Sequence, residues 1–473
     1  MALTKAHNRM IEGAAVNVKD FGAVGDGTTD DTTAIQAAID YAYANDKPII
    51  IEGQYRTVST INITCPTVFA LNATITKDLD NTEVIRFIGD VGGASANFKS
   101  LIGKLTAGQS AKPSSQASAH AFVFEDVIHA SFGHLNTGHC AYGFANDETT
   151  AFGRFWGNYI EQLTCRGCVQ GYLTLPYPGS GAHTENFIGV AYFNGKELNS
   201  ATLLPKNDDP IYINNMEGLV FGTLNIEWTE ISGGGAFVNI DNDSTLVINT
   251  LHFEGNELNN AVSVGIFDVS NSGSAPININ IENCHFNNLV QTAGTLSLVI
   301  ATTASVGTCH VNTFSGNASS NSTSDMRILD TDGSFTVDLS AQSGWERYFN
   351  QRRKGGTPPN FLSNIWFGGT PDETLNTVNN PGATVDLGYA NHVRLTGTAT
   401  ASIATFDADA KNQERIRLIT VTNSSSGSIT LTGTGNLKAP QGATFDLTLS
   451  ANRTALIAFN FLTSTAEIIN FTA

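Results

Sequence analysis

The amino-acid sequence predicts an all-β protein built on a parallel β-helix, and three observations lead to this fold class. A segment that alternates apolar and polar residues recurs about every 27–33 residues. Helical patterning nearly vanishes after residue 45. The rest of the chain consists of short β-type segments punctuated by Gly, Asn and Ser. A repeat of this length with one strand per period is what a coil of a parallel β-helix requires.

The repeat becomes visible when five segments are aligned. Residues at equivalent positions lie 28, 33, 27 and 33 residues apart in the order Thr164, Tyr192, Asn225, His252 and His285. The aligned segments are residues 158–167, 186–195, 219–228, 246–255 and 279–288, with an earlier copy at 131–138 and a weaker one at 309–317. A leucine-rich repeat has a shorter unit, and a propeller blade has four strands in a longer one. Neither matches this period.

Composition and charge exclude several classes of protein. The chain has 473 residues, of which 41% are hydrophobic, which is too many for a disordered protein. Its 25 basic and 43 acidic residues give a formal charge of −18, which argues against binding nucleic acid or an anionic membrane surface. No apolar run approaches the ~18 residues of a spanning helix, so we expect no membrane insertion. The first residues, MALTKAHNRMIEG, lack the apolar stretch of a signal peptide.

Cysteine usage predicts neither a disulfide framework nor a metal site. The chain has 6 cysteines, and Cys165 and Cys168 form its one CxxC motif, with no second pair at zinc-ribbon spacing. We therefore expect buried or incidental thiols, no bound metal and no cofactor.

The N-terminal region contains the one clear helix signal. Residues 16–19 alternate as in a short strand, residues 25–27 form a tight turn, and a helix is expected over 33–42. Asp30, Asp31 and Thr32 precede this helix and are expected to cap it with their side chains. The residues that share its apolar face are Ile35, Ala38, Ile39 and Ala42.

The stretch of residues 20–40, DFGAVGDGTTDDTTAIQAAID, resembles the N-terminal cap of the pectate-lyase-like right-handed β-helix superfamily, common in phage tailspikes and capsule depolymerases. Residues 7–13 resemble the junction after the virion-binding domain in tailspikes of phages that infect Acinetobacter. The resemblance covers residues 5 to 340. It implies a right-handed β-helix, a homotrimer, a place on the phage tail and action outside the host cell. We expect attachment to the tail through an upstream domain that this chain lacks.

Four parts are expected along the chain. Residues 1–45 form the junction and cap, 46–342 the β-helix that binds and acts on the receptor, and 343–380 a linker. Residues 381–473 are expected to form an antiparallel β-rich, sandwich-like domain, with strands at 415–422, 428–432, 444–449 and 455–459. Trimerisation is favoured for this domain over carbohydrate binding. The basic stretch at 345–356, followed by Thr357-Pro358-Pro359, predicts the boundary.

The aligned register predicts a candidate site. Adjacent coils stack about 4.8 Å apart, so Glu227 should lie over Glu254, and Glu230 over Glu257. Carboxylates this close suit a retaining glycosidase, and one pKa of such a pair should rise, whereas a diagonal pair would suit an inverting enzyme. We therefore regard these four glutamates and His252 as catalytic candidates. The candidate substrate-binding residues are Trp228, as a sugar-stacking surface, and Tyr192, Arg166, His285, Asn225 and Asn287.

These residues support three functional hypotheses. The first is a trimeric depolymerase that cleaves a bacterial capsular polysaccharide within its chain by glycoside hydrolysis. The second is a lyase that uses Tyr192, His252 and Arg166 on a uronic-acid unit, but the scarcity of basic residues in the coils favours hydrolysis. The charge of −18 would repel an acidic capsule unless Arg or Lys lines the groove, and so favours a neutral or mildly charged sugar. The third is a spike that binds without cleaving, because outward polar columns on a β-helix are also typical of solvated surface.

Overall fold

The computed structural model divides into two compact units, residues 1–356 and 357–473. It describes residues 14–89, 98–113, 119–146, 154–175, 183–198, 202–206, 209–232, 235–242, 244–258, 263–270, 276–287, 290–291, 295–302, 305–316, 325–331, 335–339, 351–354, 375–379, 384–386, 392–396, 401–403, 405–407, 416–432, 437–438, 446–460 and 465–471. The expected junction at 7–13 and the segment Thr357-Pro358-Pro359 lie outside the described residues, as do residues 345–350, 355 and 356.

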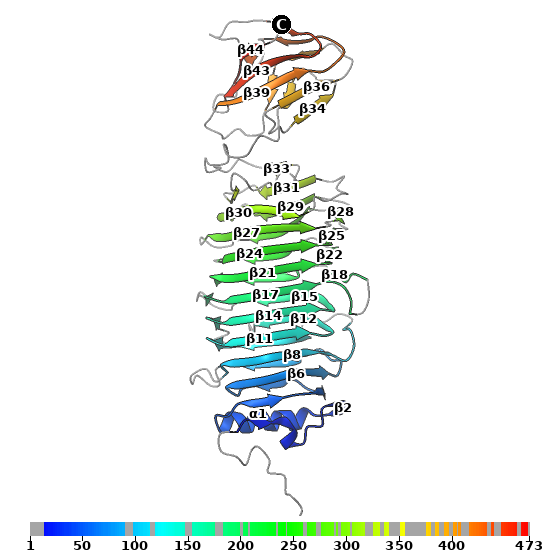
Figure 1. Cartoon of the computed structure of the whole chain (residues 1–473), viewed down its shortest axis with the longest axis vertical. Coiled ribbons are helices and arrows are strands. Elements are labelled where there is room, and N and C mark those ends of the chain that lie inside the picture. The colour runs from blue at the N-terminus through cyan, green and yellow to red at the C-terminus, as the bar shows by residue number, and fades with distance from the viewer. Residues whose placement is uncertain are drawn as a thin grey trace, which may run out of the picture. The chain divides into compact units, whose positions relative to one another are not determined.

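The first unit is a stack of parallel coils, as the repeat predicts (Figure 1). Its first sheet follows the order β1 (Val16–Asn17), β3 (Ile49–Ile51), β6 (Thr67–Lys77), β8 (Ser100–Gln109), β11 (Ser131–Thr137), β14 (Tyr159–Arg166), β17 (Phe187–Asn194), β21 (Leu219–Glu227), β24 (Thr245–Glu254), β27 (Ile277–Asn287), β30 (Gly307–Gly316) and β32 (Thr336–Leu339). In the same sheet β4 (Gln54–Thr57) pairs with β6, and β2 (Asp26–Asp30) pairs with β4. Every pairing in this sheet is parallel.

A second parallel sheet closes each coil. It contains β5 (Ile61–Ile63), β7 (Ile85–Ile88), β9 (His120–Glu125), β12 (Cys140–Asn146), β15 (Cys168–Leu175), β19 (Ile211–Asn214), β23 (Gly235–Asp241), β26 (Ser263–Ser270), β29 (Thr295–Ala301), β31 (Asp325–Thr331) and β33 (Gln351–Lys354). A third sheet has the order β18 (Pro205–Lys206), β22 (Glu230–Ile231), β25 (Glu257–Leu258) and β28 (Val290–Gln291). Shorter pairs join β10 (Val127–Ile128) to β13 (Phe155–Trp156), and β16 (His183–Thr184) to β20 (Met216–Glu217).

The core fills the inside of the coils with ladders of stacked apolar residues. Leu163, Ala191, Leu224, Leu251 and Cys284 occupy one register position on successive coils, and all are fully buried. The residues on either side of them point outward, as the alternation in each strand predicts. The inward ladder therefore fixes which side chains of each coil lie on the surface.

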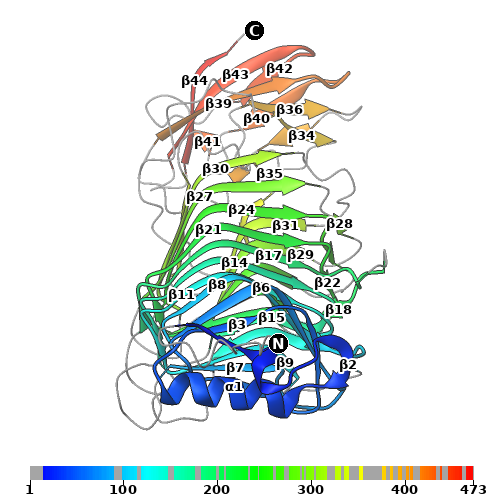
Figure 2. The same ribbon diagram turned by 60° about the horizontal axis from the view of Figure 1, so that its bottom comes forward.

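The N-terminal helix α1 (Thr32–Ala44) is present where the sequence predicts it, and its buried residues are the four predicted ones. It contacts β1, β3 and β5 at the first-coil end of the stack (Figure 2). The predicted strand at 16–19 is shorter, because a 3₁₀ turn, η2 (Val18–Phe21), follows β1.

The predicted capping role of Asp31 is wrong. Asp31 precedes α1 but makes no side-chain hydrogen bond to it. Instead its buried carboxylate accepts from the backbone N–H groups of Val24 and Gly25, at 2.7 and 3.0 Å. Asp30, the last residue of β2, accepts from the backbone N–H and hydroxyl of Thr32, the first residue of the helix, at 3.1 and 2.6 Å. The acidic run thus ties the preceding loop to the helix.

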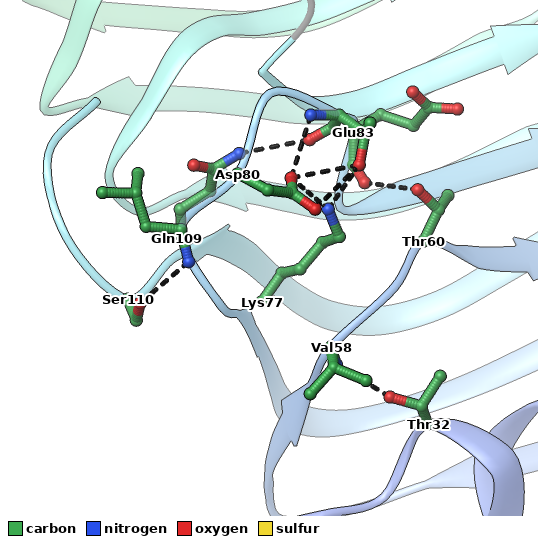
Figure 3. A network of polar contacts seen from close by, with 10 residues as sticks. Thr32, Val58, Thr60, Lys77, Asp80, Glu83, Gln109 and Ser110 are labelled. Carbon is green, nitrogen blue, oxygen red and sulfur yellow. Dashed lines mark hydrogen bonds and ion pairs between the residues drawn. The ribbon is translucent and has the colours of Figure 1, made fainter. Parts of the chain in front are cut away.

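A buried cation holds the loop that follows β6 (Figure 3). The side chain of Lys77 is fully buried, and its ammonium forms an ion pair with Asp80 and a hydrogen bond with Thr82. Gln109, next to Lys77 in register, donates to the Thr82 carbonyl at 3.1 Å. These contacts join the loop to two successive coils.

The second unit contains a mixed sheet in the order β34 (Leu375–Asn379), β36 (His392–Thr396), β39 (Ile416–Asn423), β43 (Arg453–Asn460), β44 (Thr465–Phe471) and β41 (Leu437–Lys438). A second sheet consists of β35 (Thr384–Asp386) and β38 (Thr405–Asp407), and a third has the order β37 (Ala401–Ile403), β40 (Ile429–Thr432) and β42 (Asp446–Leu449). The predicted antiparallel pairing holds for β39–β43–β44 and β40–β42. In contrast, β34, β36 and β39 run parallel, as do β37 and β40. Alternation alone does not specify the direction of a neighbouring strand.

Two further expectations concern cysteines and the membrane. All 6 cysteines are buried, as predicted. In the part of the chain that the structure describes, no helix combines the length and apolar character that crossing a membrane requires.

One glycine pair tests how tightly the coils stack. Gly103 and Gly22 have φ angles of +98° and +99°. A Cβ on Gly103 would lie 2.2 Å from the Ala70 carbonyl oxygen of the coil below, whereas one on Gly22 would meet nothing within 4 Å. We expect Gly22→Ala to cost about 1 kcal/mol through backbone strain alone, and Gly103→Ala at least about 2 kcal/mol more. Equal losses of melting temperature would contradict this account of coil contact.

A buried carboxyl on β26 makes stability depend on pH. Burial, then the negative charges of Asp209 and Asp241, raise the pKa of Asp268 to about 6. Its Oδ1 is buried and has no hydrogen-bond partner among the described residues. Below about pH 4 the carboxyl is protonated in both states; as the pH rises through 6 the folded state must ionise it, and the stability contributed by the bound proton is lost.

We therefore expect Asp268→Asn to stabilise the protein more at pH 8 than at pH 4, by on the order of 2 kcal/mol. Thermal melts of the variant and the parent protein at both pH values measure this. The same difference in melting temperature at both pH values would show that the Asp268 proton contributes nothing.

Candidate active site

The candidate site lies where two outward columns run across β14, β17, β21, β24 and β27. The sequence predicted both columns, and the register confirms them. The first contains Arg166, Asn194, Glu227, Glu254 and Asn287. The second, two residues earlier on each strand, contains Thr164, Tyr192, Asn225, His252 and His285. Residues far apart in sequence thus become neighbours because the inward ladder sets the register.

Glu227, His252 and Glu254 form the centre of the site. His252 Nε2 lies 2.9 Å from Glu254 Oε2 and 3.7 Å from Glu227 Oε1. The exposed fractions of the side chains are 14% for Glu227, 23% for His252 and 29% for Glu254. The two glutamates are register neighbours as predicted, but an imidazole links them. All three side chains are partly shielded and still open to solvent.

Tyr192 orients Glu227 from the coil below. Its hydroxyl donates to Glu227 Oε2 at 2.9 Å, and the buried Asn194 amide donates to the Tyr192 oxygen at 3.2 Å. Burial, followed by the hydrogen bond to Glu227, raises the pKa of Tyr192 above its usual value. Tyr192 is therefore a protonated donor at neutral pH.

The coil above supports His252. The His285 ring stacks on the His252 ring with centroids 5.0 Å apart and planes at 13°. His285 Nδ1 in turn lies 3.0 Å from the Ser315 hydroxyl oxygen. Asn225 donates to the Ala191 carbonyl at 3.3 Å, which ties two coils together beneath His252, and Asn287 follows Glu254 in register. These contacts hold the imidazole in one orientation.

Trp228 turns away from the strand directly after Glu227. It has a φ of +50°, and its indole contacts Gly255 so closely that a Cβ there would lie 2.7 Å from the ring. The Lys196 ammonium lies 3.4 Å from the ring centroid. Sequence reasoning missed Lys196, because the aligned segment ended at Gly195, one residue short of it.

Glu230 and Glu257 are register neighbours, as predicted, but they belong to the third sheet. The turn at Trp228 and Thr229 separates them from Glu227 and Glu254, which belong to the first sheet. The four glutamates therefore form two pairs on different sheets.

Three side chains of the site offer donor atoms suited to a metal. One carboxylate oxygen of Glu227, one of Glu254 and a nitrogen of His252 all lie within 4.8 Å of one another. Imidazole and carboxylate together suit first-row divalent ions such as zinc or manganese. The same spacing also places two carboxylates close enough to act on one bond.

Comparison with known proteins gives a local family match. Residues 15–91 match the family model described as "Rhamnogalacturonase A/epimerase, pectate lyase-like". A stretch of 28 residues is 82% identical to mannuronan C5-epimerase AlgE5 of Azotobacter vinelandii, and it spans 6% of this chain and 3% of that protein.

Two solved tailspikes are similar to most of the chain at low identity. The tailspike protein of E. coli bacteriophage HK620 has 11% identity and a TM-score of 0.43, covering 96% of this chain and 87% of that one. The Acinetobacter phage vb_AbaP_AS12 gp42 tailspike also has 11% identity, with a TM-score of 0.39, covering 98% and 82%. Independently of these structures, the predicted resemblance of DFGAVGDGTTDDTTAIQAAID is confirmed by the match of residues 15–91 to the pectate-lyase-like family model.

Proposed function

We propose that this protein is a phage tailspike depolymerase that binds a bacterial capsular polysaccharide and cleaves it within the chain by glycoside hydrolysis. The arrangement of Glu227, His252 and Glu254 supports the proposal, because an oxygen of each of two partly exposed carboxylates lies within 4.8 Å of the other, and a pair of close carboxylates is what glycoside hydrolysis uses. The pectate-lyase-like match at residues 15–91 and the parallel coils support it. A right-handed sense of the β-helix, assembly as a homotrimer on the virion tail and action at the host cell surface belong to the same proposal.

Glu227 is the nucleophile in this mechanism. It is the less exposed of the two carboxylates, and the Tyr192 hydroxyl donates to its Oε2, which fixes the orientation of the carboxylate. Its free oxygen attacks the anomeric carbon as the glycosidic carbon–oxygen bond breaks. Glu254 delivers a proton to the departing sugar oxygen. His252 Nε2 lies 2.9 Å from Glu254 Oε2 and holds that carboxyl group in position.

The second half of the reaction restores the enzyme. Glu254, now ionised, takes a proton from water, and the resulting hydroxide attacks the anomeric carbon of the Glu227 ester. The ester bond breaks, Glu227 leaves as a carboxylate, and Glu254 is protonated again. The net reaction adds one water across the glycosidic bond and leaves a reducing end.

The state of Tyr192 favours hydrolysis over β-elimination. A lyase needs a base that removes the proton next to a uronate carboxyl group. The raised pKa of Tyr192 makes the phenolate scarce at neutral pH, and its hydroxyl proton is already directed at Glu227. Tyr192 therefore acts as a donor that orients the nucleophile.

Substitution of the two glutamates tests this assignment. We expect Glu227→Gln and Glu254→Gln each to reduce the release of reducing ends by at least about a hundredfold, because each removes a group that forms or breaks a bond. The assay uses a panel of purified Acinetobacter capsular polysaccharides, acidic and neutral. Glu282→Gln is the matched control, since Glu282 is exposed on β27 and accepts a hydrogen bond from Asn312. Variants that cleave as well as the parent protein would contradict the roles of Glu227 and Glu254.

The spacing of the carboxylates also predicts the stereochemistry. Donor oxygens within 4.8 Å of one another are nearer to the ~5–5.5 Å separation of retaining enzymes than to the ~6.5–9.5 Å that inverting enzymes leave for a water molecule. We expect the first-formed product to keep the anomeric configuration of the bond that is cleaved. Proton NMR of the nascent reducing end measures this, and inversion would exclude Glu227 as a nucleophile.

A further inference from the structure

We propose that Arg166 and Lys196 form an anion-binding subsite that holds the negatively charged group of an acidic sugar beside Glu227. The inference rests on the proposed function, because it names the class of polysaccharide that the same site takes. It replaces the expectation of a neutral or mildly charged sugar, which assumed that few basic residues lie near the site.

Arg166 lies at the end of β14, on the coil that precedes Tyr192 and Asn194. It is exposed and occupies the same register position as Asn194 and Glu227, two coils from Glu227, which places their Cα atoms roughly 10 Å apart. The long side chain of an arginine can cover much of that distance. Its positive charge also acts on the Tyr192 hydroxyl, where it opposes the rise in pKa caused by burial. The guanidinium is thus within electrostatic reach of the donor that orients Glu227.

Lys196 approaches from the side. Its ammonium lies 3.4 Å from the centroid of the Trp228 ring, and Trp228 directly follows Glu227. The Asn194 side chain accepts from the Lys196 backbone N–H at 2.9 Å, so the segment that carries the lysine is tied to the column below Glu227. The cation–π contact holds the charge beside the site without neutralising it.

Among the residues that the structure describes, neither cation is paired with a carboxylate. Within the described residues Arg166 and Lys196 form no ion pair, whereas Lys77, Arg86 and Arg154 each contact an acidic side chain. Cations left unpaired in a chain of charge −18 keep their full attraction for an anion in solution.

The basic residues near the site belong to the coils that precede β21. Residues 207–326, which supply the coils from β19 to β30, contain no Lys or Arg, although they contain the site glutamates. Arg166 and Lys196 precede this stretch and lie on the two coils below β21. An acidic sugar therefore binds with its charged group toward β14 and β17, and the bond to be cleaved lies over Glu227 and Glu254.

Binding measurements with charge-altered polymer and protein test the subsite. The probes are acidic and neutral Acinetobacter capsular polysaccharides, and the acidic ones after chemical reduction of their carboxylates to alcohols. Dissociation constants are measured by calorimetry on the Glu254→Gln background, which stops cleavage. We expect Lys196→Met and Arg166→Gln each to weaken binding of an acidic polymer about five- to tenfold and to leave binding of the reduced polymer unchanged. Lys104→Met, at an exposed lysine of β8, is the matched control.

Three results would overturn the subsite: equal weakening for the acidic and the reduced polymer, no weakening for either, or binding of neutral polymers only. The proposed function is judged separately by product release. If an acidic polymer binds through Arg166 and Lys196 but is never cleaved by the parent protein, the subsite stands and hydrolysis is wrong. If Lys196→Met and Arg166→Gln bind and cleave it as well as the parent protein, the subsite is wrong and hydrolysis stands.

Discussion

The in-register stacking of parallel coils is the constraint on which the rest of this structure depends. Each inward apolar residue rests on its equivalent in the next coil, as Leu224 does on Leu251, and backbone hydrogen bonds keep the strands about 4.8 Å apart. A slip by one residue would turn the buried ladder outward and expose it to water. The surface columns are therefore fixed by the core, and a residue such as Glu227 owes its neighbours to side chains on the opposite face of its own strand.

The candidate site uses that constraint to gather polar groups that no single coil could supply. Tyr192, Glu227, Glu254 and His285 come from four successive coils. Tyr192 donates to Glu227, His252 lies between the two glutamates, and His285 stacks on His252. Strand spacing sets the distance between the carboxylates, so the geometry needs little from flexible loops. The loop side chain that does enter is Lys196, held over Trp228 at the point where the chain leaves the first sheet. Chemistry and charge recognition are thus supplied by different parts of a coil.

Much of this could be predicted from the sequence, because periodicity reports directly on register. The pairing of Glu227 with Glu254 and of His252 with His285 followed from aligned segments alone, as did the buried face of α1. Contacts that depend on loop conformation could not be predicted in this way. Asp31 binds loop N–H groups that no pattern identifies, and Lys196 lies beyond the end of the repeat. The relative direction of paired strands in the second unit could not be predicted from the alternation of apolar and polar residues either, since parallel and antiparallel neighbours can show the same pattern.

The most direct test of the account is the chemistry of the product. Purified capsular polysaccharide that the protein degrades should be digested while reducing ends and the ultraviolet absorbance of an unsaturated uronate are followed together. Hydrolysis at Glu227 and Glu254 predicts that reducing ends rise while the absorbance stays flat. A parallel rise of both signals would mean β-elimination and would contradict the roles assigned to the two glutamates.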